Sequence, residues 1–185
     1  MNDFLTSLRL FLLSIVVCSV AYPAVMGGFA ALTAPESRQG SLVRNSEGEI
    51  VGSRLLAQNF SRPEYFWPRP SACDYNAGGA AGSNWSPTNS KITVRAEEII
   101  GRLQPGVGQP VPADLVSASG SGLDPHVTLA AAMLQASRVA AARNLLIDEL
   151  KTLVREHSDS ATLAVFGDPV VNVLELNLAL EELEH

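Results

Sequence analysis

The sequence predicts an α+β protein in which one apolar N-terminal helix precedes a single mixed domain. Three observations support this class. Residues Leu10–Leu32 form a run of 23 residues without a charge. Later stretches repeat apolar residues every three or four positions, which is typical of amphipathic helices. Short β-branched runs bounded by Gly and Pro are typical of strands. We therefore expect a transmembrane anchor over 1–34 and a domain over 35–185.

Composition limits the function classes. The chain has 185 residues, of which 46% are apolar and 17% charged, so it can bury a core and is not globally disordered. Its net charge of −6 argues against nucleic-acid binding, which needs a basic face. Residues 148–185 carry nine acids and two bases, so the surplus acid lies in the last fifth of the chain. Cys18 and Cys73 are too few for a disulfide framework or a cysteine-ligated metal site.

The apolar run is long enough to cross a bilayer. A helix of 23 residues, at a rise of ~1.5 Å per residue, extends roughly 35 Å. The alternative is a cleaved signal peptide, but its apolar core is ordinarily ~7–15 residues. A retained anchor is therefore the preferred interpretation. The positive charges do not decide its orientation, because Arg9 lies on one side and Arg38 and Arg44 on the other.

Four small residues in the span have the spacing of a helix–helix contact. Ala24 and Gly28 are four residues apart, as are Gly27 and Ala31. Small residues at this spacing allow a neighbouring helix to approach closely, so we expect a partner helix on this face. The alternative is that Ala and Gly are simply common in such spans.

A long loop, 61–89, follows a polar tether over 35–50. It contains five aromatic residues, Tyr65, Phe66, Trp67, Tyr75 and Trp85. Loops of this length without regular structure usually carry function or contact a partner. The preferred interpretation is that the aromatic side chains pack onto the domain; the alternative is an interface, where Tyr and Trp are enriched.

The remaining helices and strands are predicted from apolar periodicity and from Gly, Pro and capping residues at their ends. Each of segments 50–60 and 111–117 is predicted as a strand or a short helix. The helices are expected at 90–103, 124–143, 145–156 and 172–183, and the strands at 162–166 and 170–173. Asp124-Pro125 is a favourable helix start, with Thr128 as an alternative cap one turn later. Asn144 is expected in a left-handed conformation between two helices, Leu146 is expected to face inward, and Asn172 is expected to cap the last helix. The terminal 183–185 resembles the start of a tag scar.

The sequence lacks the common catalytic motifs. There is no glycine-rich phosphate loop, and neither of the two lysines, Lys91 and Lys151, follows a glycine. The best candidate for a nucleophile is Ser119 or Ser121, because Asp124 and His126 follow closely in the sequence. The alternative, which we prefer, is a turn whose hydroxyls and carboxylate cap the next helix. Gln135 and Arg138 are expected on the polar side of that helix, as surface or interface groups.

Several motifs together point to a family. They are Tyr65-Phe66-Trp67-Pro68-Arg69-Pro70-Ser71-Ala72, Gly82-Ser83-Asn84, Pro87-Thr88-Asn89, Val111-Pro112-Ala113-Asp114-Leu115-Val116, Ser119-Gly120-Ser121-Gly122-Leu123-Asp124-Pro125-His126, Gln135 with Arg138, and Val171-Asn172-Val173-Leu174 with Leu176-Asn177. With the N-terminal span, they resemble the C subunit of the Kdp-type potassium-transporting P-type ATPase, over nearly the whole chain. The Ser-Gly-Ser-Gly-Leu-Asp-Pro-His run is the most specific. Trp67-Pro68 departs from the His-Gly usual in that family.

The resemblance implies a non-catalytic accessory subunit of an ATP-driven potassium uptake complex in the inner membrane. Its partners would be a channel-like potassium-translocating subunit and an ATP-hydrolysing subunit, and it would act as a catalytic chaperone that raises ATP affinity. ATP and potassium would be handled by the complex, with no intrinsic cofactor. The implied topology is N-terminus cytoplasmic and domain extracytoplasmic. The candidate interface or functional-loop residues are Tyr65, Phe66, Arg69, Ser71, Ser83, Asn84, Ser119, Ser121, Asp124, His126, Gln135 and Arg138.

These implications constrain the mechanism. A domain outside the membrane cannot touch a cytosolic nucleotide, so any effect on ATP affinity would be allosteric. We expect the chain to support assembly and to cover the extracellular potassium entrance. The acidic C-terminal segment could concentrate cations there, although a solvated acidic face is the simpler interpretation. The competing functions are a membrane-tethered serine hydrolase using Ser121 and His126, and an envelope-binding module using the aromatic loop.

Overall fold

The structure is a computed structural model that describes residues 2–45, 47–106, 108–159 and 167–183. The chain divides into two compact units, Met1–Leu42 and Val43–His185. It is a mixture of helices and short strands, as predicted.

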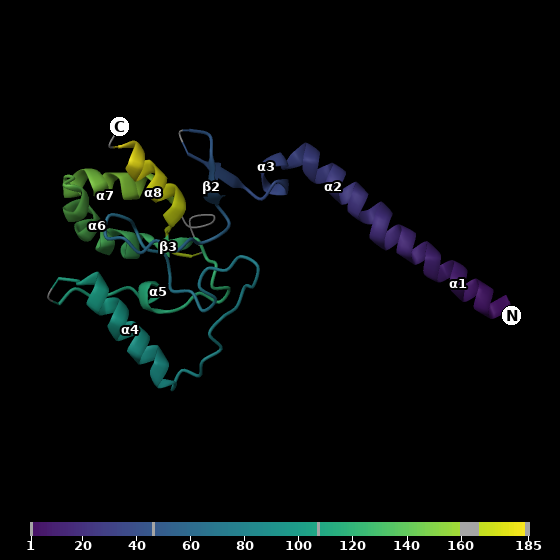
Figure 1. The fold of residues 1–185 in the computed structure, drawn as a ribbon, viewed down its shortest axis with the longest axis horizontal. Helices are drawn as coiled ribbons and strands as arrows, with labels where there is room; N and C mark the ends of the chain where they lie inside the picture. Colours follow the sequence, from purple (N-terminus) through teal and green to yellow (C-terminus); the bar gives the residue numbers. More distant parts are fainter. Residues whose placement is uncertain (1, 46, 107, 160–166, 184–185) are drawn as a thin grey trace. The chain divides into compact units, whose positions relative to one another are not determined.

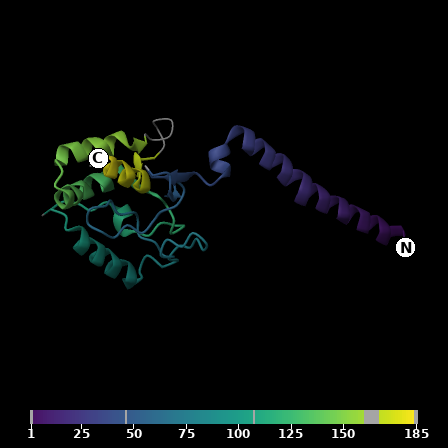
Figure 2. The ribbon, with the colours of Figure 1, turned by 45° about the horizontal axis from the view of Figure 1, so that its top comes forward.

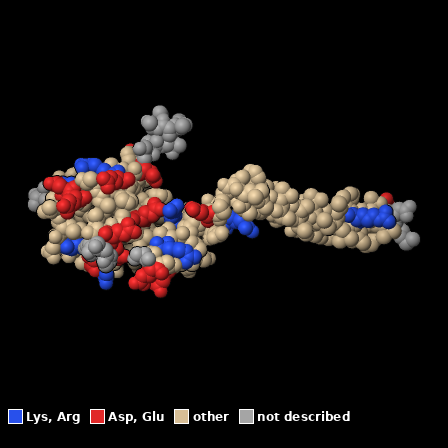
Figure 3. Space-filling model, turned by 90° about the horizontal axis from the view of Figure 1, so that it is seen from above, with Lys and Arg blue, Asp and Glu red and all other residues tan. Residues whose placement is uncertain are grey.

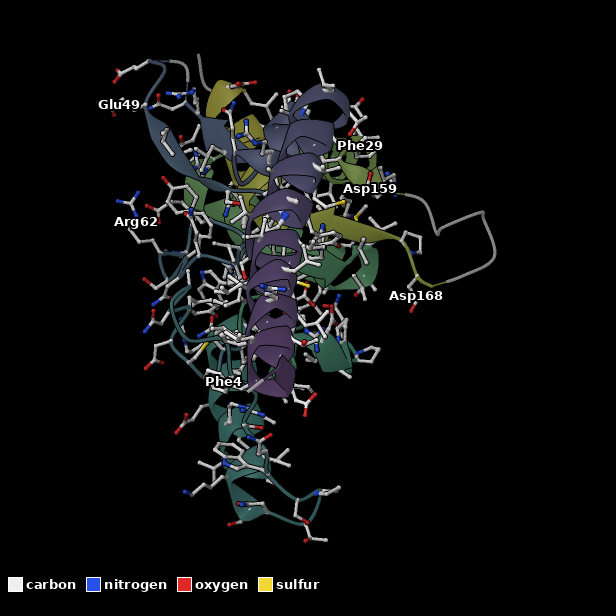
Figure 4. All side chains as sticks on the ribbon, turned by 90° about the vertical axis from the view of Figure 1, so that its right-hand side faces the viewer. Phe4, Phe29, Glu49, Arg62, Asp159 and Asp168 are labelled. Atoms are coloured by element: carbon white, nitrogen blue, oxygen red, sulfur yellow. The ribbon has the colours of Figure 1, made fainter. Side chains whose placement is uncertain are left out.

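The first unit is dominated by one continuous helical rod. It comprises α1 (Asn2–Ile15), a π-helical segment η1 (Val16–Ala21) and α2 (Tyr22–Thr33), followed by the single turn α3 (Pro35–Arg38). Over Asp3–Thr33 its length and mean hydropathy of 2.1 suffice to cross a membrane, and none of its most apolar part is buried within the protein. Figure 3 shows charged atoms only toward the ends of this rod. Phe4 and Phe29, labelled in Figure 4, are 70% and 61% exposed.

The π-helical segment ends two residues before Pro23. Pro23 has no N–H, so a regular α-helix would lose one hydrogen bond at this point. The N–H of Tyr22 instead donates to the carbonyl of Val17, five residues earlier. The wider turn is therefore located where proline already interrupts the α-helical ladder.

The second unit contains two small sheets. Strands β1 (Leu42–Arg44) and β2 (Ile50–Ser53) form a hairpin. Strands β3 (His126–Thr128), β5 (Val170–Asn172) and β4 (Ser158–Asp159) form an antiparallel sheet with β5 in the centre. Val127 lies opposite Val171, and Ser158 also pairs with Val171. β3 and β5 each lead directly into a helix, α6 and α8 respectively.

Helices cover this sheet and form the core. They are α4 (Ser90–Leu103), α5 (Ala113–Val116), α6 (Leu129–Arg143), α7 (Ile147–Glu156) and α8 (Val173–Glu182). Figures 1 and 2 show α6 and α7 side by side with α8 next to them, and α4 at the edge of the domain. The centre of the core is formed by fully buried residues of α6, α7 and α8, with Phe66 from the aromatic loop (residues 61–89): Ala131, Ala132, Ala136, Val139, Leu150, Val154, Leu176 and Leu180. The small side chains of α6 allow the neighbouring helix α7 to approach closely.

Several sequence predictions are confirmed. Helix α4 has the expected bounds, with Asn89 as its N-cap. Asn144 is left-handed, at φ 56°, and separates α6 from α7. The Asn172 side chain accepts hydrogen bonds from the N–H groups of Leu174 and Glu175 and so caps α8. Segment 111–117 contains the short helix α5, whereas 50–60 begins with strand β2.

The predicted helix start at Asp124-Pro125 is wrong. Residues His126–Thr128 form β3, and α6 begins only at Leu129, capped by Thr128, whose Oγ1 accepts from the N–H of Ala131. Pairing with β5 therefore overrides the local proline signal. The second helix starts at Ile147, and Leu146, predicted to face inward, is 68% exposed at its N-cap. The predicted strand Thr162–Phe166 lies outside the described residues.

Candidate functional site

Two buried amide side chains hold consecutive residues of the aromatic loop. Asn177 of α8 accepts from the Phe66 N–H at 2.8 Å and donates to the Phe66 carbonyl at 3.0 Å. Gln135 of α6 makes the same pair with Trp67, at 2.8 and 3.1 Å. Asn177 and Gln135 are 2% and 1% exposed. Each side-chain amide thus pairs with the backbone N–H and carbonyl of one loop residue, as a neighbouring strand would. Together the two amides hold the loop against α6 and α8.

Arg138 adds a third attachment one turn along α6. Its guanidinium donates to the carbonyls of Pro63 and Tyr65 and to Oε1 of Gln135. The same group lies over the Trp67 ring, 3.7 Å from the centroid. Burial, together with the nearby charge of Arg102, lowers the pKa of Arg138 to about 10. The prediction that Gln135 is a surface or interface group is therefore wrong, because Gln135 is buried beneath the loop, whereas Arg138 stays partly exposed.

Tyr65 connects the loop to the ends of α6 and α8. Its hydroxyl donates to Glu181 at 2.7 Å, and this hydrogen bond is the main reason that its pKa is raised. The Arg143 guanidinium lies over the Tyr65 ring and donates from Nε to the Glu64 carbonyl. The expectation that the aromatic side chains pack onto the domain holds best for Phe66, which is fully buried.

The Ser-Gly-Ser-Gly run forms a second contact with the aromatic loop. The Ser119 N–H donates to the Pro70 carbonyl, and the Ala81 N–H donates to the Ser121 carbonyl. Gly122 has φ +70°, and a Cβ there would lie 2.6 Å from Cys73 Sγ and 2.8 Å from the Ala81 carbonyl. The glycine at this position is therefore required both by its backbone conformation and by the close approach of the loop.

A charged cluster also joins the aromatic loop to the segment that follows the Ser-Gly-Ser-Gly run. Arg69 of the aromatic loop forms an ion pair with Asp124, at 2.9 Å, and Asp124 lies 3.6 Å from Nδ1 of His126. The contact with Asp124 is the main cause that raises the pKa of His126, and the contact with His126 is the main cause that lowers the pKa of Asp124. Asp124 Oδ1 also accepts from the His126 N–H. Asp124 thus joins the aromatic loop to the chain entering β3 instead of capping a helix.

The geometry does not assemble a serine hydrolase. Ser121 Oγ accepts from the Leu123 N–H, and among the described residues no hydrogen bond links Ser121 to His126. Ser119 is buried, at 3% exposure. A nucleophile needs its base within hydrogen-bond reach, so this cluster holds loops together and does not form a nucleophile–base pair.

Most of the predicted site residues lie where the aromatic loop contacts α6 and α8, or where it contacts the Ser-Gly-Ser-Gly run. Ser71 Oγ accepts from the N–H groups of Cys73 and Tyr75 and shapes the loop beneath Gly122. Ser83 and Asn84 follow Gly82 but lie beyond the contacts, and neither side chain hydrogen-bonds to another residue of the described segments. Asn177 belongs to the motifs behind the family resemblance, but it is not among the candidate site residues predicted from the sequence. Its signal was a single amide among the leucines and alanines of 174–180, where only a paired polar group is tolerated.

Comparison with known proteins shows the family of the chain. The model of the family described as K+-transporting ATPase, c chain, matches residues 4–182. A potassium-transporting ATPase KdpC subunit of Parvibaculum lavamentivorans is 45% identical, covering 100% of this chain and 98% of its own length. One from Ralstonia nicotianae is 47% identical over 91% of this chain and 85% of the relative, and one from Gloeobacter violaceus is 40% identical over 95% and 94%. The chain therefore belongs to the K+-transporting ATPase c chain family.

Proposed function

We propose that this chain is the accessory subunit of an ATP-driven potassium uptake complex, anchored by one membrane-spanning helix. The match over residues 4–182 carries the proposal, because it includes both the apolar helix and the domain. The partners would be a channel-like potassium-translocating subunit and an ATP-hydrolysing P-type subunit. The chain itself supplies no catalytic group in this proposal.

The helix is suited to lie against lipid and against another helix. Its large apolar side chains are exposed; Val25 and Leu32, for example, are 68% and 86% accessible. A Cβ added at Gly27 or Gly28 would meet nothing within 4 Å, so these positions leave room for a neighbouring backbone. With Ala24 and Ala31 they form the small-residue face on which we propose that a partner helix packs. The N-terminus would be cytoplasmic and the domain extracytoplasmic, in the inner membrane.

The proposed action on ATP affinity is indirect. An extracytoplasmic domain is separated from cytosolic ATP by the membrane, so a chaperone effect must be a coupling free energy carried by the membrane helices. The domain would be attached at the extracellular potassium entrance of the translocating subunit. The clamped aromatic loop supports this role, because a rigid surface binds a partner with little loss of conformational entropy.

Co-purification tests the proposal. The tagged chain is expressed in its host under potassium starvation, and its membranes are solubilised gently. We expect a potassium-channel-like subunit and a P-type ATPase to elute with it, and potassium-stimulated ATPase activity to fall strongly when the chain is deleted. Elution of the chain alone, under conditions that preserve other membrane complexes, would refute the proposal.

A pair of variants tests the packing face. Gly28→Leu fills the proposed contact and should reduce recovery of the partners while the domain stays folded. Met26→Leu is the control because, at ~100° per residue, Met26 lies roughly 160–200° around the helix from Ala24 and Gly28. Equal recovery of the partners with both variants would rule out this face.

A further inference from the structure

A cleft separates helix α4 from the aromatic loop. Its volume is about 420 Å³, within the range of small-ligand sites. Four apolar side chains from three segments line part of it: Phe60, Ile99, Leu103 and Leu115. The rings of Trp67 and Tyr75 contribute to the loop side. Burial raises the pKa of Tyr75 to about 12, so its hydroxyl stays neutral and donates to the Arg69 carbonyl.

Charges of both signs line the cleft. Arg95, Glu98 and Arg102 come from α4, and Asp74 comes from the loop. Among the described residues, none of the four forms an ion pair within 4.0 Å. Glu98 and Arg102 are four residues apart on one helix, a spacing that ordinarily favours pairing. The cleft therefore presents two cations and two carboxylates that do not neutralise each other by direct contact.

The tryptophan rings account for the position of the arginines. The Arg102 guanidinium lies 4.7 Å from the centroid of Trp67, and that of Arg95 lies 4.8 Å from the centroid of Trp85. Stacking holds each planar group in place while leaving N–H donors at its edge. Nε of Arg95 is shielded from solvent and has no hydrogen-bond partner among the described residues. Among the described residues, neither guanidinium group donates a hydrogen bond to the protein, although Glu98 and Asp74 line the same cleft.

We propose that this cleft binds a small zwitterion of the α-amino acid class with an apolar side chain. The ligand carboxylate would accept hydrogen bonds from the arginine side, with Arg102 as the main partner. The ammonium group would be held by Glu98 and Asp74, and the apolar side chain would lie against Phe60, Ile99 and Leu103. A zwitterion can contact charges of both signs at once, whereas a simple anion or cation can pair only with the arginines or only with the carboxylates.

This inference does not depend on the proposed transport role, because all of its residues belong to the one domain. Binding is therefore measured on the full-length chain alone, in detergent micelles, by calorimetry against a micelle blank. L-phenylalanine and L-leucine are the probes. L-phenylalaninamide, which lacks the carboxylate, and N-acetyl-L-phenylalanine, which lacks the ammonium group, are the comparison compounds.

We expect saturable binding of the two amino acids and at least tenfold weaker binding of both comparison compounds. Arg102→Gln and Glu98→Gln should each weaken L-phenylalanine binding by about tenfold. Both side chains are exposed, so neither change should unfold the domain. Arg155→Gln, at an exposed position on α7 away from the cleft, is the matched control and should leave binding unchanged. Failure of either amino acid to saturate, equal affinity for a comparison compound, or equal effects of the three variants would overturn the proposal.

Discussion

Asn177 in α8 and Phe66 in the aromatic loop, 111 residues apart in sequence, exchange two hydrogen bonds in the interior of the domain. The Phe66 side chain is fully buried, so its backbone groups cannot reach bulk water. Without Asn177, both groups would lack partners. The pair therefore allows an irregular loop to enter the core.

Replacing Asn177 by Leu should lower the free energy of unfolding by about 2–4 kcal/mol, because it leaves a buried N–H and a buried carbonyl unpaired. Urea unfolding of the full chain in detergent, followed by far-UV circular dichroism, measures this change. Asn59→Leu is the control at an exposed position. An equal effect of the two substitutions would show that the buried pair contributes nothing specific.

Arg138→Lys should cost about 1–3 kcal/mol although the charge is kept. A lysine ammonium cannot reproduce the forked contacts with two loop carbonyls and Gln135 while stacking on Trp67. We also expect the near-ultraviolet dichroism of tryptophan to weaken. The matched control is Arg155→Lys at an exposed position of α7. Unchanged stability and an unchanged tryptophan signal would contradict the assigned clamp.

Gly122→Ala and Gly120→Ala form a matched pair within the Ser-Gly-Ser-Gly run. At Gly122 the backbone has φ +70° and the new Cβ would meet Cys73 Sγ and the Ala81 carbonyl, so we expect a loss of more than about 2 kcal/mol. At Gly120 a Cβ would meet nothing within 4 Å, so a loss below about 1 kcal/mol is expected there. Urea unfolding compares the two, and similar losses would refute the close approach described here.

The His126–Asp124 contact should make part of the stability depend on pH. The pKa of His126 is raised above its ordinary 6.5, so its contribution is fully present below pH 6.5 and is lost as pH rises through the folded-state value. The pKa of Asp124 is lowered below 3.8, so its contribution is lost only as pH falls through that depressed value.

Replacing His126 by Asn should therefore cost more stability at pH 5.5 than at pH 8.5. The difference should stay below about 1 kcal/mol, because the pair is partly exposed to solvent. Urea midpoints of the wild-type chain and the variant at the two pH values give the result. A larger cost at pH 8.5 would reverse the assigned sign.

Removing the true cap of α6 should have a measurable cost. Thr128→Ala deletes the Oγ1 acceptor for the Ala131 N–H and should reduce stability by about 1 kcal/mol. Thr93→Ala, at an exposed position within α4, is the control, because it removes a hydroxyl without removing a cap. The same unfolding assay applies, and indistinguishable midpoints for the two variants would argue against capping by Thr128.

Elements whose signals are local can be predicted from the amino-acid sequence alone. Periodicity and composition predict the apolar run of 23 residues and the bounds of α4. Interactions within one or two turns account for the left-handed conformation of Asn144 and for the Asn172 cap. The motif resemblance also identified the family. These features need no knowledge of distant contacts, since the forces behind them act between neighbouring residues.

The start of α6, the burial of Gln135, the contacts of Arg138 and the role of Asn177 depend on tertiary contacts. His126–Thr128 became a strand because β5, more than 40 residues later, provides its hydrogen-bond partners. Gln135 and Arg138 are polar at the surface of an isolated helix, but the aromatic loop packs over them and supplies hydrogen-bond partners for both. In each case the deciding partner is remote in sequence. Burial of a polar group becomes favourable only once that partner is in place.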